Sequence, residues 1–152
     1  MLSKSAWLFE ITAFVVLLLL WTVGAQPSIA QSASEAIKAE NKKGWRIPDN
    51  ALNEKSPLTP TPDGLNKGKG LFKTHCQKCH GPDGKGKGED AEHEHPPADL
   101  TASRLPDGIM FYKVWNGRSA PTMPVFKSKI SKDEVWTVIE YAKSLRHESG
   151  AP

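Results

Sequence analysis

The segment Cys76-Gln77-Lys78-Cys79-His80 decides what the rest of the chain must provide. Two cysteines separated by two residues and followed directly by histidine form the C-x-x-C-H attachment signature of c-type haem. One helical turn over this spacing brings both thiols to the two vinyl groups of haem and points the histidine at the iron. We therefore predict one covalently attached haem c, bound through Cys76 and Cys79, with His80 as an iron ligand.

Other uses of a C-x-x-C pair fit the sequence less well. A C-x-x-C pair can form half of a zinc site, but a second pair of cysteines is then needed. Cys76 and Cys79 are the only cysteines in the chain. A redox disulfide with this spacing belongs beside a β-α-β pattern, which the sequence lacks. A structural disulfide in an exported protein is the remaining alternative.

The amino-acid composition also favours a covalently bound cofactor. The chain has 152 residues, of which 38% are hydrophobic, 24% charged and 8% aromatic, and this length allows one small domain with additional segments. The apolar residues are concentrated between Ala6 and Ala25. The remainder is too poor in apolar side chains to build a large core, so a covalent macrocycle would supply the missing apolar volume.

Three helices are expected around the motif. The first begins near Thr61-Pro62-Asp63, an N-cap residue followed by proline, and leads to the cysteines. The second spans about Pro106–Asn116 and ends at Gly117. The third begins at Ser131, which forms a capping box with Glu134. A stripe of apolar residues at helical spacing then follows: Val135, Val138, Ile139, Ala142 and Leu145. No strand alternation is evident, so we predict an all-α domain with long loops.

These features resemble the small monohaem cytochromes c of class I. Gly68 and Phe72 precede the first cysteine by eight and four residues, and the glycine-rich stretch Gly81–Gly86 follows His80. The resemblance implies a class I cytochrome c fold, with three main helices and long loops around one covalent haem. It places Gly68 where the first and last helices cross and Phe72 beneath the haem. The resemblance also implies that Tyr141 and Leu145 are the residues of the last helix that pack against the first helix at this crossing.

A second resemblance concerns the other side of the iron. Met123 lies in Pro121-Thr122-Met123-Pro124, where two prolines stiffen the loop. Together with Gly117 before it and Phe126 after it, this segment is similar to the loop that carries the sixth ligand in the family. The resemblance implies that Met123 is the second axial ligand. Met110, in contrast, lies within a helical apolar pattern and is expected in the core.

The stretch 86–97 departs from the family because it is acidic and contains His93 and His95. We expect a solvated acidic loop, with a distal iron ligand or a second metal site as alternatives. One of the two prolines that follow, Pro96 or Pro97, is expected to provide the carbonyl that accepts a hydrogen bond from the His80 ring.

The N-terminus is expected to direct export. Lys4 precedes the apolar stretch Ala6–Ala25, which is typical of a cleaved signal. As a retained anchor, the run would extend roughly 28 Å as a helix, enough for a bilayer core. Both interpretations place the remainder on the exported, periplasmic side. We divide the chain into residues 1–25, the signal or anchor; 26–61, a Pro/Ser/Ala-rich tether; 62–147, the monohaem domain; and 148–152, a C-terminal tail.

The predicted function is electron transfer by a haem with His/Met ligation, not catalysis. The alternative is a haem protein with an open sixth position that binds gases or acts on peroxide. Redox partner proteins are expected, including a membrane electron-transfer complex, with membrane attachment through the N-terminal segment if it is uncleaved. Nucleic-acid binding is excluded, because the net charge is only +3 and the aromatic residues follow core-facing patterns. Six lysines crowd the attachment motif and form a weakly basic face: Lys67, Lys69, Lys73, Lys78, Lys85 and Lys87.

Overall fold

The computed structural model describes residues 29–119 and 122–148. The chain divides into two compact units, residues 1–32 and 33–152. The expected leader, residues 1–25, lies outside the described residues, and the predicted haem-site residues all belong to the second unit. Within the described part of the chain, no helix combines the length and the apolar composition needed to cross a bilayer.

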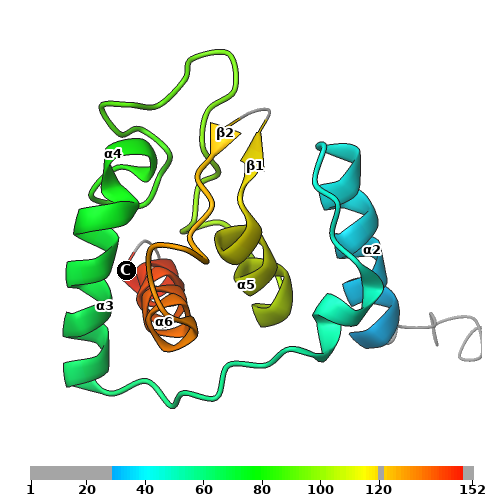
Figure 1. Cartoon of the computed structure of the whole chain (residues 1–152), viewed down its shortest axis with the longest axis horizontal. Helices are drawn as coiled ribbons and strands as arrows, with labels where there is room; N and C mark the ends of the chain where they lie inside the picture. The colour runs from blue at the N-terminus through cyan, green and yellow to red at the C-terminus, as the bar shows by residue number, and fades with distance from the viewer. Residues whose placement is uncertain (1–28, 120–121, 149–152) are drawn as a thin grey trace, which may run out of the picture. The chain divides into compact units, whose positions relative to one another are not determined.

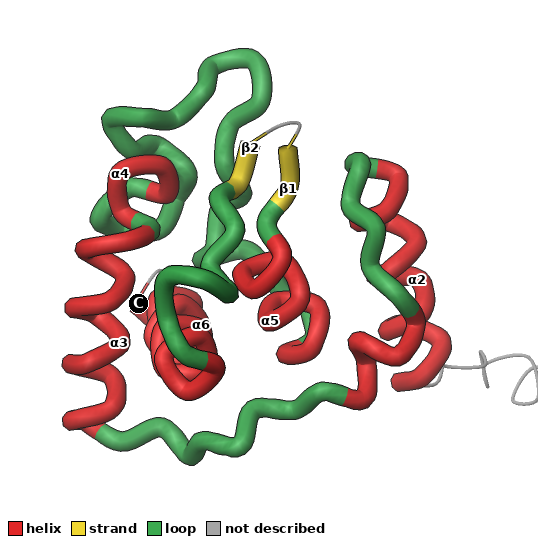
Figure 2. Tube along the Cα trace, viewed as in Figure 1, coloured by secondary structure: helices red, strands yellow, loops and turns green. Residues whose placement is uncertain are grey.

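The described part is helical, as Figures 1 and 2 show. The elements in chain order are α2 (Ile29–Lys42), the 3-10 helix η1 (Asp49–Asn53), α3 (Pro62–His75), α4 (Gln77–His80), α5 (Asp107–Asn116), β1 (Arg118–Ser119), β2 (Thr122–Met123) and α6 (Lys132–Glu148). The two strands contain two residues each and pair antiparallel, with Arg118 opposite Met123. The all-α prediction is confirmed, and this short hairpin is the strand structure of the described residues.

The three predicted helices begin and end where the local signals indicate. The Thr61 side chain accepts a hydrogen bond from the Gly64 amide at 3.1 Å, so it caps α3. At the start of α6, the Ser131 hydroxyl accepts from the Glu134 amide at 3.2 Å, and the Glu134 carboxylate accepts from the Ser131 amide at 2.9 Å. Gly117 ends α5 with a φ of 59°, a left-handed conformation that favours glycine. Local capping chemistry therefore sets these boundaries.

Helices α3 and α6 cross closely at Gly68. A Cβ atom at Gly68 would lie 2.6 Å from the Thr137 carbonyl oxygen and 2.7 Å from the Tyr141 Cβ. One turn further along, the rings of Phe72 and Tyr141 pack with centroids 5.4 Å apart, and Leu145 joins their cluster. The crossing expected from the family resemblance is confirmed, and it holds the end of α3 firmly against α6.

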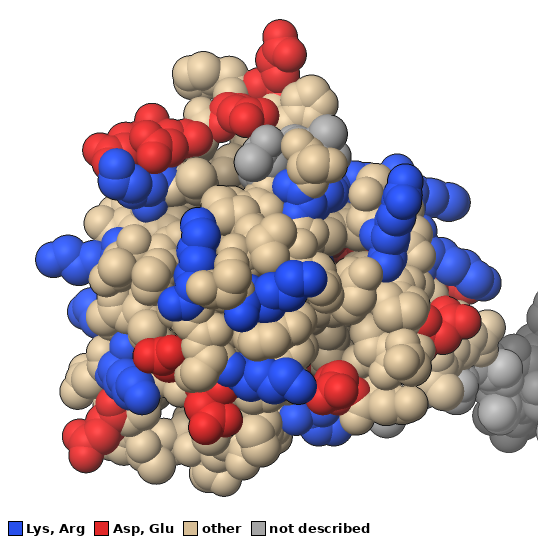
Figure 3. All heavy atoms as spheres, in the orientation of Figure 1, with Lys and Arg blue, Asp and Glu red and all other residues tan. Residues whose placement is uncertain are grey.

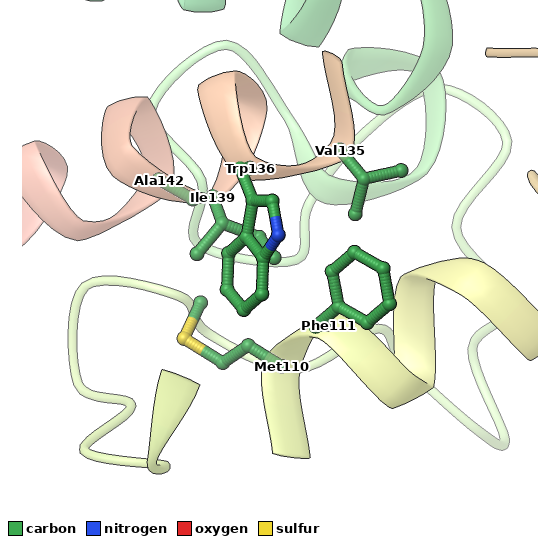
Figure 4. Close-up of a cluster of buried hydrophobic side chains, with 6 residues drawn as sticks. All are labelled: Met110, Phe111, Val135, Trp136, Ile139 and Ala142. Carbon is green, nitrogen blue, oxygen red and sulfur yellow. The ribbon is translucent and has the colours of Figure 1, made fainter. Parts of the chain in front are cut away.

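The main apolar cluster lies between α5 and α6 (Figure 4). Trp136 extends from α6 toward Met110 and Phe111 of α5. The rings of Phe111 and Trp136 stack at 4.5 Å, and Trp115 stacks on the same Phe111 at 5.7 Å. Because α6 also packs against α3, it is the helix on which both neighbours rest (Figure 1).

The packed part of the chain begins before the predicted domain boundary at residue 62. Four upstream residues surround Ile109, whose side chain is fully buried: Ile37, Trp45, Ile47 and Ala51. At Gly108, an added Cβ would lie 1.7 Å from the Ala51 carbonyl oxygen, so η1 packs directly on the backbone of α5. Much of the predicted tether therefore belongs to the compact unit, and residues 54–61 then lead without regular structure to α3.

Candidate functional site

One cavity of about 620 Å³ collects the predicted site residues. Cys76, Cys79 and His80 lie on its wall at the α3–α4 corner, and Met123 lies on its wall at the hairpin. Phe72 and Leu100 supply apolar surface between them. Residues that are up to 47 positions apart in sequence thus face one space.

The C-x-x-C-H segment forms a single turn of helix. The amides of Cys79 and His80 both donate to the Cys76 carbonyl, at 3.2 and 2.9 Å. The following loop folds back onto this turn, since the Gly86 amide donates to the His80 carbonyl at 2.7 Å and the Gly88 amide to the Cys79 carbonyl at 3.0 Å. A Cβ at Gly88 would lie 2.0 Å from the Lys78 carbonyl oxygen, so this approach requires glycine. The turn is therefore held rigidly from two sides.

The His80 ring is oriented by the backbone. Its Nδ1 lies 3.1 Å from the Ala98 carbonyl oxygen, which fixes the tautomer with the proton on Nδ1 and leaves the Nε2 lone pair available. Burial lowers the pKa of the imidazole, partly offset by this hydrogen bond, so the ring is neutral at pH 7. A neutral, oriented imidazole is the form that binds iron.

The expected acceptor, Pro96 or Pro97, was wrong by one or two residues. The carbonyl of Pro97 faces Gly86 instead, where a Cβ would lie only 2.1 Å from its oxygen. Gly86 has a φ of 76°, in the left-handed region that favours glycine, and the absence of a side chain there lets the Pro97 carbonyl approach its backbone. This close approach turns the next carbonyl, that of Ala98, toward His80.

Both cysteines are partly buried, and the pKa values of their thiols are raised. Burial raises the pKa of Cys76 to about 12. Burial and the nearby carboxylates of Asp90 and Glu92 also raise the pKa of Cys79. A thiol with a raised pKa is mostly protonated at pH 7, so neither cysteine has the lowered pKa of a reactive thiolate. Elsewhere in the described residues, no group of three or more His, Cys, Asp or Glu side chains is arranged to hold a metal ion.

Met123 and Met110 occupy different environments. Met123 is half-buried in β2, and the backbone of its loop presses on Gly117, where a Cβ would lie 2.5 Å from the Met123 carbonyl oxygen. Met110 is 8% exposed within the α5–α6 cluster, and its sulfur accepts a hydrogen bond from Arg146 at 3.3 Å. Both side chains border the cavity, but Met110 belongs to the α5–α6 cluster, whereas Met123 lies in the hairpin and packs against the cluster around Ile109.

One known family matches the part of the chain that contains this site. The family model described as cytochrome C oxidase, cbb3-type, subunit III matches residues 63–141, which include every residue of the predicted site. The chain belongs to this family. Its matched part is a class I c-type cytochrome domain, with covalently bound haem c as cofactor and haem-based electron transfer as its activity. A search of curated proteins found no match.

The cavity of this cytochrome fits haem c. Its volume lies within the range of about 300–1,000 Å³ typical of cofactor sites. The donor set is also appropriate, because two thiols lie at one corner and an imidazole nitrogen and a thioether border the same space. The neutral state of His80 and the apolar side chains of Phe72 and Ile139 suit a largely apolar macrocycle.

Two histidines besides His80 border the cavity, His75 and His95. His75 borders the cavity and packs edge-on against Phe126, with ring centroids 6.0 Å apart. Of the two histidines in the acidic loop, both are exposed and only His95 reaches the cavity wall. Neither the C-x-x-C-H motif nor helical periodicity indicates these positions, since they depend on how the loop after α4 folds.

A charged group on the cavity wall was also missed. Glu40 of α2 is nearly fully buried and pairs with Lys43 at 2.8 Å and Lys113 at 2.5 Å. Burial alone would raise the pKa of Glu40, but the hydrogen bonds from the two lysines outweigh it and hold the pKa below its ordinary value. Burial lowers the pKa of Lys113, which the bond with Glu40 partly offsets. The partners Glu40 and Lys113 are 73 residues apart, so no sequence pattern connects them.

The predicted lysine face is exposed at all six positions. It is not uniformly basic, because Lys78 lies 3.6 Å from Glu89 and 3.9 Å from Asp90. Figure 3 shows acidic side chains gathered at the top of the view and basic side chains spread over the middle. The cytochrome therefore presents a mixed surface with a modest basic excess.

Proposed function

We propose that Cys76 and Cys79 carry the haem through two thioether bonds and that His80 and Met123 are its two axial ligands. The observation that supports this most directly is the shared cavity, which brings an oriented imidazole and a loop methionine to one apolar space. With His80 and Met123 both bound to the iron, no position would be left for a substrate, so the domain would act as an electron carrier.

The haem iron supplies a one-electron couple between the ferrous and ferric states. The protein controls this couple through its ligands. The thioether of Met123 favours the ferrous state and raises the potential, while the hydrogen bond from His80 Nδ1 to Ala98 increases the basicity of the imidazole. The turn of α4, held by backbone hydrogen bonds from the following loop, would keep the cofactor position fixed during electron transfer, which limits reorganisation.

We further propose that the domain works on the periplasmic side of a membrane and exchanges electrons with a protein partner, including a membrane electron-transfer complex. The family is described as a subunit of a cytochrome c oxidase, which supports this class of partner. The exposed lysines around α4 form a weakly basic docking face, suited to a small, transient and salt-sensitive interface. The N-terminal segment, when retained, would tether the domain to the membrane.

The test is carbon monoxide binding by the reduced cytochrome. The wild type is expected to bind CO poorly, because Met123 fills the sixth position. Met123→Ala should bind CO readily and have a lower reduction potential, since a thioether that favours ferrous iron is lost. The matched control is the double variant His93→Ala/His95→Ala, which should behave as the wild type does. Rapid CO uptake by the wild type, or a spectral change in the histidine variant alone, would favour the open-site alternative.

A further inference from the structure

The segment upstream of the family match forms part of the haem cavity. The match begins at residue 63, yet Glu40, Lys43 and Trp45 border the same space as Cys76 and His80. Trp45 is 7% exposed, although it stands in a linking stretch between α2 and η1. This part of the wall is therefore a contribution of this chain beyond the matched domain.

Trp45 lies between two cations. The Lys113 Nζ is 4.5 Å from the centroid of its ring, and the centre of the Arg118 guanidinium is also 4.5 Å from a Trp45 ring centroid. Arg118 also donates a hydrogen bond to the carbonyl of Lys43. We call Glu40, Lys43, Trp45, Lys113 and Arg118 the Trp45 cluster; all five border the cavity. The cluster contains three cations and one carboxylate. Its formal net charge is therefore positive and would be neutralised by two carboxylates of a ligand.

Glu40 holds two of these cations in place through ion pairs. Its two oxygens bond to different lysines, Oε1 to Lys43 and Oε2 to Lys113, and its side chain is 5% exposed. Cations at a partly buried wall are costly unless an anion lies close by. Among the five residues of the cluster, one carboxylate faces three cations, so an anion bound beside them would be electrostatically favoured.

The location of the cluster identifies the anions. Two thioether bonds at Cys76 and Cys79 would fix the vinyl edge of the macrocycle at the α3–α4 corner, and the two propionates of haem lie on the opposite edge. The cysteines lie at the α3–α4 corner, whereas the cluster comes from α2, the stretch after it, α5 and β1. Figure 1 shows α4 on one side of the β1–β2 hairpin and α2 on the other. Asp99 and Arg104 also border the cavity, but their charges oppose each other and they lie in the loop that contains the His80 acceptor.

We propose that the Trp45 cluster is the binding site for the haem propionates and that the upstream segment completes it. This inference rests on the proposed attachment of haem at Cys76 and Cys79. Lys113 and Arg118 neutralise the carboxylates, Trp45 holds both cations in place, and Glu40 is a positioning residue that sets how much positive charge the haem experiences.

The proposal predicts opposite shifts in the reduction potential of the holo-protein. Lys113→Gln should lower the potential, because uncompensated negative charge near the haem stabilises the more positive ferric state. Glu40→Gln should raise the reduction potential, because removing a negative charge near the haem destabilises the ferric state. The matched controls are Lys143→Gln and Asp107→Asn, which break a similar partly buried ion pair at 3.0 Å that does not border the cavity. Both controls should retain the wild-type potential.

A second readout addresses the propionates directly. In resonance Raman spectra, the propionate bending band should shift in Lys113→Gln and stay unchanged in Lys143→Gln. If Lys113→Gln does not fold, Glu40→Gln/Lys113→Gln removes both charges together, and the same band should still shift. The proposal is overturned if variants with covalent haem keep the wild-type band and potential, or if the controls shift equally. Absence of covalent haem in the wild type would instead contradict the attachment at Cys76 and Cys79.

Discussion

The crossing of α3 and α6 at Gly68 can be tested against a neighbouring position on the same helix. An added Cβ at Gly68 would lie 2.6 Å from a backbone oxygen and 2.7 Å from the Tyr141 Cβ, closer than unbonded atoms approach. A Cβ at Gly70 would meet nothing within 4 Å. Because both positions lie inside α3, Gly→Ala brings the same gain in helix propensity, about 0.5–1 kcal/mol.

The two variants should therefore differ only by the cost of overpacking. Separating the helices or moving the backbone of α6 costs about 1–3 kcal/mol. Gly70→Ala should stabilise the holo-protein by about 0.5–1 kcal/mol, and Gly68→Ala should be less stable than Gly70→Ala by about 1–3 kcal/mol. Urea unfolding of the two proteins, followed by circular dichroism, measures this difference, and thermal unfolding should show roughly 4 °C per kcal/mol. Equal stabilities for the two variants would refute the close crossing.

Three further expectations concern the haem, the core and the leader. Replacing Cys76 and Cys79 with Ala should abolish haem that survives denaturing electrophoresis and should leave the domain poorly folded; a well-folded double variant would contradict this. Met110→Ala should lose about 2–5 kcal/mol in urea unfolding without gaining CO binding, because the side chain is buried in the α5–α6 cluster. If the leader is retained, haem protein should stay with membranes after a high-salt wash. An N-terminal sequence that starts at Gln26 or Gln31 would instead establish cleavage.

Sequence patterns predicted the features that depend on neighbours within a few residues. The cap at Thr61, the capping box at Ser131 and the helix end at Gly117 each involve hydrogen bonds or conformations spanning three or four positions. The attachment turn and the crossing at Gly68 were accessible through spacing and through the resemblance to class I cytochromes c. These local predictions agree with the structure because the packing of the helices favours the same conformations as the local sequence.

The features that escaped prediction depend on contacts between distant segments. The acceptor for His80 is Ala98 because Pro97 faces Gly86, and nothing in the local sequence indicates that approach. The pair between Glu40 and Lys113 joins a helix near the start of the compact unit to α5. A carboxylate and an amine that meet across 73 residues leave no periodic trace, and each side chain alone is typical of an exposed helix surface.

The contact of η1 with Gly108 bears on how the domain could be moved between proteins. A fragment that began at Pro62 would keep the whole haem motif but would lose Ile37, Ile47 and Ala51, the cover over Ile109. The face uncovered on α5 would be apolar and shaped to receive the Ala51 carbonyl. A portable module of this chain would therefore include α2 and η1, which precede the matched segment, because a fusion joint at residue 63 would remove residues that pack on α5.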